Sequence, residues 1–198
     1  MSGKPRFDEE SVLNAAMDVL WRHGYAASSM DQLTTAMGLS RSSLYKRFGD
    51  KEGLFREVLS TYTERVVRRM GAVQADTKRE QLRALLLDFL PKDGRRSRPP
   101  GCMLARSCTE MADLPAGGQA AAREGLARQR MIFVEILREA VAEGELPSDA
   151  DVDGLAWHYL GVLQAIMNLP QAGATADEVR RVVDLGMQAW PAAGRRKH

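Results

Sequence analysis

A run of hydrogen-bonding side chains follows Ser40, and their types are those that proteins use to contact DNA. Arg41 can donate two hydrogen bonds to the O6 and N7 atoms of a guanine. Ser42 and Ser43 can donate to base edges or accept from them, and so they discriminate less strongly between bases. The same stretch carries further basic and hydroxyl side chains: Tyr45, Lys46 and Arg47. This combination predicts a segment that reads base edges in a DNA groove.

The sequence around this run predicts two short helices joined by a tight turn, which is the helix-turn-helix arrangement. Ser29 and Gln32 form a capping-box pattern that starts the first helix, and Ser40 is placed to cap the second. Gly38 lies between them, where the turn needs a positive φ. The apolar residues recur on one face of each helix: Met30, Leu33 and Met37 in the first, Leu44 and Phe48 in the second. The donors after Ser40 therefore lie on the opposite face.

Helix starts on either side of this segment are candidate phosphate contacts. Lys51 begins the following helix, and Ser28 and Ser29 precede the first; free amide groups at a helix start bind anions. The alternative is that the whole face is an ordinary solvated surface. Because the caps, the turn glycine and the buried residues all agree with one arrangement, we favour DNA recognition. The predicted DNA-binding residues are Ser28, Ser29, Arg41, Ser42, Ser43, Tyr45, Lys46, Arg47 and Lys51.

The chain of 198 residues has the composition of an ordinary globular protein, with 44% apolar and 27% charged residues. Its net charge of +2 means that affinity for DNA must come from a local cluster of basic groups. The N-terminus lacks the apolar core of a signal peptide, and no apolar run approaches the length of a membrane span. Two cysteines do not make a disulfide framework. We expect a cytoplasmic protein with no membrane partner.

Helical periodicity continues through the rest of the chain, and no segment predicts a convincing strand. We expect an all-α protein of about nine helices. Beyond the two motif helices, the expected ranges are 9–23, 51–66, 80–90, 102–112, 119–143, 148–169 and 176–190. We place an N-terminal three-helix helix-turn-helix DNA-binding domain at 1–52, a second helical domain at 53–192 and a disordered basic tail at 193–198.

The first quarter of the chain resembles the DNA-binding domain of the TetR/AcrR family of bacterial transcriptional regulators. The matching segments are Ala15-Ala16, Gly24-Tyr25, Ser28–Leu33, Ala36–Ser40, Leu44–Phe48 and Lys51–Leu54. The most specific of these is the Leu44–Phe48 segment, followed closely by a helix that starts at Lys51. Thr34 departs from the alanine that is usual in the family. The resemblance implies that Tyr45 approaches the phosphate backbone of DNA.

The same resemblance implies the role of the remaining chain, which is variable in sequence within this family. It implies a C-terminal helical ligand-binding and dimerisation domain. It further implies a repressor that binds a palindromic operator in double-stranded DNA as a homodimer and that an unknown small-molecule effector releases. The helix that begins at Lys51 is expected to transmit the effect of effector binding to the DNA-binding helices. Neither catalysis nor a cofactor is expected.

Two helical segments near the C-terminus have the residues of a dimer interface. Apolar residues occur nearly all round the 152–169 segment, so more than one side of it must be covered. Small residues there allow another helix to approach closely. Mostly from the resemblance, we predict a four-helix interface with a second copy, formed by Gly154, Trp157, Gly161, Val179, Val183 and Met187. The alternative is that both helices lie inside the core of one subunit.

The effector pocket is predicted only as a collective property of the middle helices. Apolar, aromatic and methionine side chains suit a pocket that adapts to its ligand. The candidate lining residues are Leu86, Phe89, Cys102, Met103, Ser107, Met111, Phe133, Leu137, Trp157 and Met167. For any one of them, a place in the core is the competing interpretation.

Cys102 raises the alternative of a thiol- or electrophile-sensing repressor. It lies near a helix start, where a thiolate is favoured, whereas a buried, inert cysteine is the competing interpretation. Cys108 is six residues further on the same helix, a rise of about 9 Å, which is too far for a disulfide. No spacing of cysteine and histidine matches a zinc site, so we expect no metal. Motifs for phosphates, dinucleotides or a nucleophile are also missing, which argues against an enzyme with a helix-turn-helix-like appendage.

Overall fold

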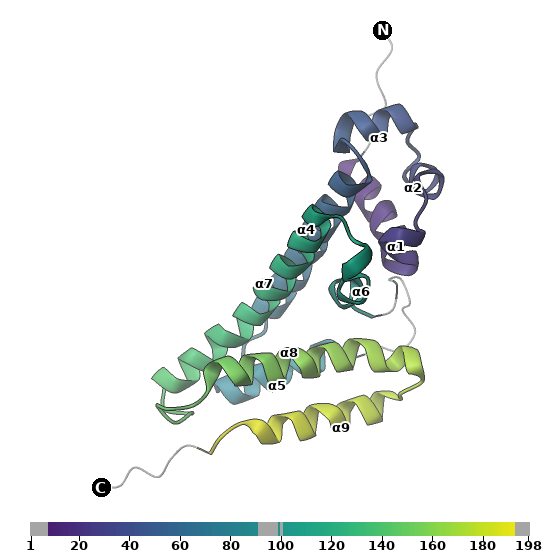
Figure 1. Ribbon diagram of the computed structural model, residues 1–198. Helices are drawn as coiled ribbons and strands as arrows, with labels where there is room; N and C mark the ends of the chain where they lie inside the picture. The colour runs from purple at the N-terminus through teal and green to yellow at the C-terminus, as the bar shows by residue number, and fades with distance from the viewer. Residues whose placement is uncertain (1–7, 91–98, 100, 193–198) are drawn as a thin grey trace, which may run out of the picture. The chain divides into compact units, whose positions relative to one another are not determined.

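The computed structural model describes residues 8–90, 99 and 101–192. Within them the chain forms nine α-helices and three short 3-10 helices, with no strand (Figure 1). The all-α fold class predicted from the sequence is confirmed. None of the described helices is long and apolar enough to span a membrane. The basic tail predicted at 193–198 lies outside the described residues.

The α-helices follow the order that the sequence predicts. They are α1 (Glu9–Ala27), α2 (Met30–Met37), α3 (Arg41–Phe48), α4 (Lys51–Gly71), α5 (Lys78–Asp88), α6 (Met103–Thr109), α7 (Ala116–Ala142), α8 (Val152–Asn168) and α9 (Ala176–Gly186). The 3-10 helices are Met111–Asp113, Leu169–Ala172 and Met187–Ala189. Helix α4 continues past its predicted end at residue 66, and α9 ends four residues before its predicted end and passes into a 3-10 turn.

Local capping explains several of these boundaries. Ser29 and Gln32 make the predicted capping box, and Thr175 and Glu178 make a second one at the start of α9. Asp50 Oδ1 accepts the backbone N–H three residues further on, at 2.7 Å, and so caps α4. Each contact satisfies an amide group that has no partner inside its own helix. The starts of α2, α4 and α9 are therefore set by residues next to them in the sequence.

The chain packs into two compact units, and each has its own core. Among the described residues, the first unit contains 8–63, 99 and 103–125, and the second contains 64–90, 101–102 and 126–192. Helices α4 and α7 each contribute one part to each unit. The first unit is larger than the domain predicted at 1–52, because α6 packs against α1 within it.

The core of the first unit lies between the apolar faces of α1 to α4. The four motif residues Leu33, Met37, Leu44 and Phe48 are buried as predicted, whereas Met30 is half-buried. Residues of α1 and α4 complete this core: Val12, Leu13, Ala16, Met17, Leu20, Trp21, Leu54, Phe55, Val58, Leu59 and Tyr62. Since the core covers both motif helices from one side, their other side is left to solvent.

The second unit is held together by α5, α8, α9 and the second part of α7. Helices α8 and α9 run side by side (Figure 1), and the His158 Nε2 atom hydrogen-bonds to the Gly186 carbonyl oxygen at 3.0 Å between them. The rings of Phe133 and Tyr159 stack with their centroids 6.4 Å apart. Leucines of α5 are fully buried against this group: Leu82, Leu85 and Leu86. The interior of the unit is thus predominantly apolar.

Candidate nucleic-acid interface

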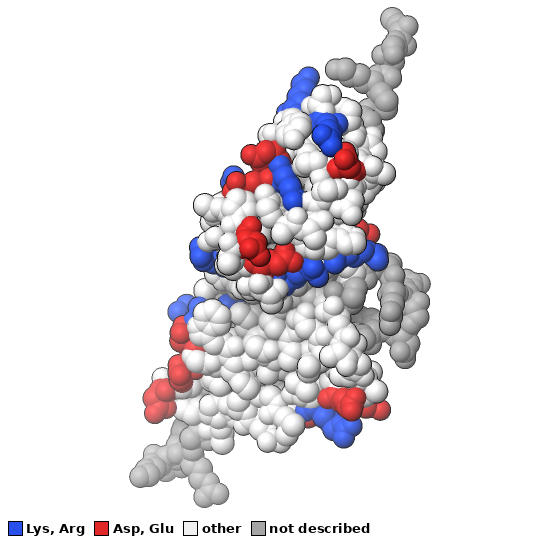
Figure 2. Space-filling model, turned by 45° about the vertical axis from the view of Figure 1, so that its right-hand side comes forward, with Lys and Arg blue, Asp and Glu red and all other residues white. Residues whose placement is uncertain are grey.

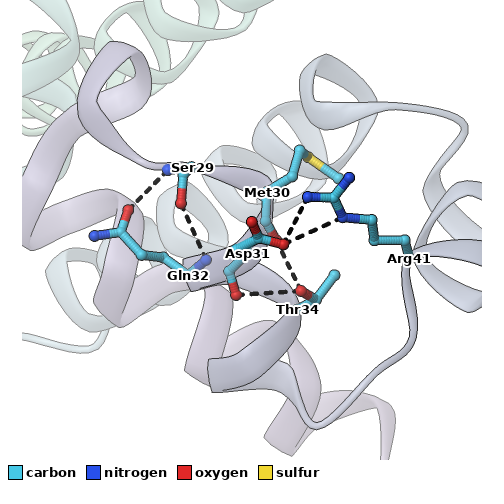
Figure 3. Close-up of polar contacts among 6 residues, drawn as sticks. All are labelled: Ser29, Met30, Asp31, Gln32, Thr34 and Arg41. Atoms are coloured by element: carbon cyan, nitrogen blue, oxygen red, sulfur yellow. Dashed lines mark hydrogen bonds and ion pairs between the residues drawn. The ribbon is translucent and has the colours of Figure 1, made fainter.

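The two motif helices are joined as the sequence predicts. Ser29 Oγ accepts the Gln32 N–H at 3.1 Å, and Gln32 Oε1 accepts the Ser29 N–H at 2.8 Å (Figure 3). Gly38 has φ 63°, in the left-handed region that favours glycine. Ser40 Oγ then accepts the Ser43 N–H at 3.1 Å and caps α3. These contacts fix where α3 begins and which of its faces is exposed.

Thr34, the departure from the usual alanine, is accommodated within α2. Its Oγ1 donates to the Met30 carbonyl oxygen at 2.9 Å and lies 3.2 Å from that of Asp31 (Figure 3). The side chain is buried with its hydroxyl satisfied, and so it does not take part in the exposed surface.

The exposed face of α3 carries most of the residues predicted to contact DNA. Arg41, Ser42, Ser43, Tyr45 and Lys46 are all exposed, and 48% of the Tyr45 surface is open to solvent. Basic side chains do not form a continuous surface on the face shown in Figure 2, because acidic side chains lie among them. Recognition of DNA must therefore depend on the positions of a few individual side chains.

Arg41 is paired with Asp31 from the start of α2, a partner that sequence reasoning missed. Asp31 Oδ1 accepts from Arg41 Nη2 at 2.7 Å and from Nε at 3.2 Å (Figure 3). The hydrogen bond to Asp31 raises the pKa of the Arg41 guanidinium, which keeps its charge. The two residues are ten positions apart, and only the turn at Gly38 brings them together.

Arg47 lies in a different environment from the other α3 residues. Its Nε donates to Glu9 Oε1 at 2.8 Å, and its Nη2 donates to Glu57 Oε1 at 2.7 Å. Its guanidinium lies 4.8 Å from the centroid of the Phe48 ring. These contacts tie α3 to α1 and α4, so Arg47 is better described as a link between helices than as a DNA contact. The sequence pattern could not separate it from Lys46.

Ser28 is also placed differently from the prediction. It is fully buried, and its hydroxyl donates to the Gly24 carbonyl oxygen at 2.5 Å. A group in this position cannot reach a phosphate, and the prediction for Ser28 is wrong for that reason. Ser29, the neighbouring residue, is exposed at the start of α2.

Lys51 stands at the first position of α4, as predicted. Its Nζ lies 4.4 Å from the centroid of the Tyr25 ring, a cation–π contact. Partial burial lowers the pKa of the Lys51 ammonium. The ammonium is therefore held on the Tyr25 ring, and its residue begins α4, a helix end that favours a phosphate.

Glu110 is a second residue that sequence reasoning missed. Gly24, with φ 82° and ψ 174°, interrupts α1, and Glu110 Oε2 accepts the N–H of the next residue, Tyr25, at 2.8 Å. The Arg106 Nε atom lies 3.1 Å from Glu110 Oε1. A Cβ atom at position 24 would collide with the Glu110 carboxylate. Glu110 thus fixes the turn that leads into α2 and that carries the ring beneath Lys51.

Comparison with known proteins identifies the family. A family model described as "Bacterial regulatory proteins, tetR family" matches residues 12–58, and one described as "Tetracyclin repressor-like, C-terminal domain" matches residues 78–185. The second match alone spans more than half of the chain. The chain belongs to the TetR family.

Similar members of the TetR family align with most of the chain. The HTH-type transcriptional repressor ComR of Escherichia coli (strain K12) is 29% identical over 196 residues, which are 96% of this chain and 92% of ComR. The transcriptional regulator AcuR of Cereibacter sphaeroides is 26% identical over 163 residues, 78% of this chain and 74% of AcuR. A cysteine mutant of the TetR family regulator CifR, solved in complex with 26bp double-strand operator DNA, is 30% identical with a TM-score of 0.81. That match covers 96% of this chain and 100% of the CifR chain. This TetR-family protein is a DNA-binding transcriptional regulator.

The predicted dimer residues of this TetR-family chain do not share one surface. Gly154, Trp157 and Gly161 of α8 are exposed, and 56% of the Trp157 surface is open to solvent. Leu185 of α9, which sequence reasoning missed, is 64% exposed. Three of the predicted interface residues are instead buried within the subunit, two on α9, which contacts α8 and α5, and one in the 3-10 turn that follows α9: Val179, Val183 and Met187.

The predicted effector residues are divided between the two units. In the first unit, Met103 and Ser107 are buried and Met111 is half-buried, and Ser107 Oγ donates to the Met103 carbonyl oxygen at 2.9 Å. In the second unit, Met167 is half-buried and five residues are buried: Leu86, Phe89, Cys102, Phe133 and Leu137. Trp157 is exposed, so its predicted place inside a pocket is wrong. Cys102 is 1% exposed, which favours the inert interpretation over the sensing one.

A buried amide pair in the second unit was not singled out from the sequence. Gln164 Nε2 of α8 donates to Gln129 Oε1 of α7 at 3.2 Å, and Gln129 is fully buried. The Gln129 Nε2 and Gln164 Oε1 atoms are buried without a hydrogen-bond partner among the described residues. The Tyr159 hydroxyl is likewise buried and unpartnered, and burial raises its pKa to about 12. Such groups are rare in native interiors and have an unused capacity to bind a polar group.

Proposed function

We propose that this regulator is a repressor that binds a palindromic operator as a homodimer and that a small-molecule effector releases. The observation that carries the proposal is the start of α3, where Arg41, Ser42 and Ser43 are exposed above a fully packed buried face. A reading helix places its first residues against base edges in the major groove. The operator complex of the relative CifR supports the same assignment.

The remaining exposed residues of the motif contact the DNA backbone in this proposal. Tyr45 and Lys46 lie one turn beyond the reading end of α3. Ser29 and Lys51 stand at the starts of α2 and α4, where amide groups and a hydroxyl or ammonium can hold one phosphate each. Phosphate contacts of this kind set the position of the reading helix on the duplex and contribute affinity without sequence preference.

Two copies of the chain are needed because a single short helix reads too few base pairs. Helix-turn-helix dimers bind half-sites that are about 34–36 Å apart, or a multiple of that distance. Trp157 and Leu185 supply an exposed apolar surface on α8 and α9 that a second copy would cover. The proposed interface keeps the two helices predicted from the sequence, but it uses their exposed residues instead of the buried Val179, Val183 and Met187.

The effector binds in the helical part of the chain and shifts the balance between DNA-competent and DNA-incompetent states. Only a difference in its affinity for the two states can do this. In the second unit, the amide pair Gln129–Gln164 offers one donor and one acceptor amid apolar residues. These groups suit a neutral, largely apolar molecule with an amide or hydroxyl group. The protein works in the cytoplasm, where the chromosome lies, and acts without catalytic turnover.

The proposal is tested with the full-length protein and a library of DNA duplexes whose central region is randomised. Repeated selection is expected to enrich one palindromic sequence, and sedimentation of the resulting complex is expected to show two chains per duplex. A gel-shift titration with excess unrelated DNA then measures the preference. Failure to enrich any sequence, or binding by a single chain, would contradict the proposal.

A further inference from the structure

Asp31 is an unexpected residue for the edge of a DNA-binding surface. Its carboxylate is negative, and 76% of its side chain is exposed at the start of α2, beside the exposed residues of α3. A negative group close to phosphates opposes binding to any duplex. An exposed ion pair contributes little to stability. A gain in selectivity is the remaining physical benefit of such a group at this place, since selectivity often costs affinity.

We infer that Asp31 is a specificity-determining residue, which orients Arg41 toward a guanine and offers its own second oxygen to the amino group of a neighbouring cytosine. This inference rests on the proposed binding of DNA through α3. It adds a second reader from α2 to the one predicted from the α3 sequence.

The geometry of the Asp31–Arg41 pair leaves free the edge of the Arg41 guanidinium that could bind a guanine. Asp31 Oδ1 is bonded to Nε and Nη2, which lie along one side of the guanidinium (Figure 3). The outer end of the guanidinium, which carries Nη1 and the second hydrogen of Nη2, has no hydrogen-bond partner among the described residues. Two parallel hydrogen bonds from that end match the O6 and N7 atoms of guanine. Asp31 therefore limits the rotation of Arg41 without occupying the atoms that read the base.

Asp31 also keeps an acceptor of its own. Its Oδ2 atom has no hydrogen-bond partner in the described part of the chain. Carboxylate oxygens accept hydrogen bonds from the N4 amino group of cytosine in the major groove. Oδ2 stands on the same carboxyl group that holds Arg41, so a base pair read by Oδ2 lies next to the one read by Arg41.

The backbone on both sides of the pair is fixed, so that the two side chains are presented in one arrangement. The capping box of Ser29 and Gln32 sets the start of α2 at Met30, one residue before Asp31. The Ser40 cap sets the start of α3, of which Arg41 is the first residue. An arginine side chain that is held in place at a capped helix end loses less conformational freedom on binding DNA than an arginine that moves freely.

The test compares wild-type protein with Asp31→Asn, Arg41→Ala and the double variant. The matched control is Asp18→Asn, which removes the same charge from an exposed position on α1. Each protein is used to select from the randomised duplex library, and fluorescent duplexes with single base-pair changes are then titrated. Thermal melting of each variant checks that the fold is kept.

For wild type we expect one guanine per half-site to be preferred by roughly fivefold to a hundredfold over other bases. Asp31→Asn should lose about fivefold or more of that preference, and also the preference at the adjacent base pair. Its affinity for random duplexes should stay the same or rise, because a negative charge is removed. Asp31→Asn should have little further effect at the guanine when Arg41 is already alanine, because the two residues act as a unit. Asp18→Asn should change none of these preferences.

Two results would overturn the inference. One is an Asp31→Asn variant with the wild-type preference at every base pair. The other is a uniform loss of affinity for all duplexes, which would mark Asp31 as a structural residue of α2. If the wild-type protein itself enriches no sequence, the proposed function fails, and the inference fails with it.

Discussion

Helix α3 and the α8–α9 pair each present side chains to solvent, but of opposite kinds. The first eight residues after Ser40 expose charged and hydroxyl groups over two buried side chains. Helices α8 and α9 expose Trp157 and Leu185, two large apolar groups. The first surface suits a charged, hydrated partner, and its binding must weaken as salt screens it. The second suits an apolar surface, so its binding should depend little on salt.

This difference in chemistry matches two different tasks. Charged and polar groups with fixed directions discriminate between partners, because a mismatched donor or acceptor stays unsatisfied. Apolar contacts are less directional and supply affinity in proportion to the area that they bury. In a regulator that reads DNA as a dimer, the first surface supplies selectivity and the second brings two reading helices together.

The largest effect on operator affinity is expected from placing charges in the apolar surface of α8 and α9. The double variant Trp157→Asp with Leu185→Asp should sediment as a monomer at micromolar concentration, because two charges would have to be buried at the interface. Its affinity for the operator should fall by about a hundredfold or more, since the two half-sites are no longer linked. Met131→Asp, an exposed apolar site on α7, is the matched control. A double variant that still sediments as a dimer would show that the interface lies elsewhere.

The next largest effect separates base reading from phosphate contact within the polar surface. Arg41→Ala should weaken binding to the selected operator by roughly tenfold to a hundredfold and relax the preference at one base pair. Lys51→Ala should weaken binding to all duplexes alike and lower the slope of log affinity against log salt by about one. Titrations at several salt concentrations measure both. Equal loss on operator and random DNA for Arg41→Ala would remove its base-reading role.

A smaller effect on operator affinity is expected from Glu110, which holds the backbone that leads into the polar surface. Glu110→Ala leaves the Tyr25 N–H without its carboxylate acceptor, and should lower the free energy of unfolding by about 1–3 kcal/mol. Operator affinity should fall severalfold as Tyr25 and Lys51 lose their fixed positions. Chemical denaturation and gel shifts measure the two effects. Asp113→Asn, an exposed neighbouring acid, is the control and should behave as wild type.

The smallest effect at neutral pH is expected in the interior of the second unit. Burial raises the pKa of Tyr159 to about 12, above the ordinary value near 10 that it has when unfolded. The phenol is neutral in both states below pH 10, so its stabilising effect is complete there and is lost as the pH rises from 10 toward 12. Tyr159→Phe should change little at pH 7 and should flatten the loss of stability with pH above 10. An unchanged alkaline profile would contradict the burial of the hydroxyl.

The two regions also differ in how far the sequence predicted them. In the helix-turn-helix, the caps Ser29 and Ser40, the turn at Gly38 and the buried residues Leu44 and Phe48 all follow from residues within four positions of one another. In α9, the apolar stripe exists as predicted, but it packs inside the subunit and does not form the dimer interface that the sequence predicts. Val179 and Val183 of α9 are buried within the subunit, where α9 contacts α8 and α5, and Met187 is buried in the 3-10 turn that follows. Helical periodicity shows that a face is covered and does not show what covers it.

The sequence by itself determined the helical class, the starts of α2, α3, α4 and α9, and the residues that α3 presents to solvent, because capping and periodicity are local. Only the tertiary structure decided which of those residues are free to act. It paired Arg41 with Asp31, tied Arg47 to Glu9 and Glu57, and placed Glu110 against a backbone amide 85 positions away. Contacts of this kind depend on how helices pack in space, and side-chain type and spacing along the chain do not encode that packing on their own.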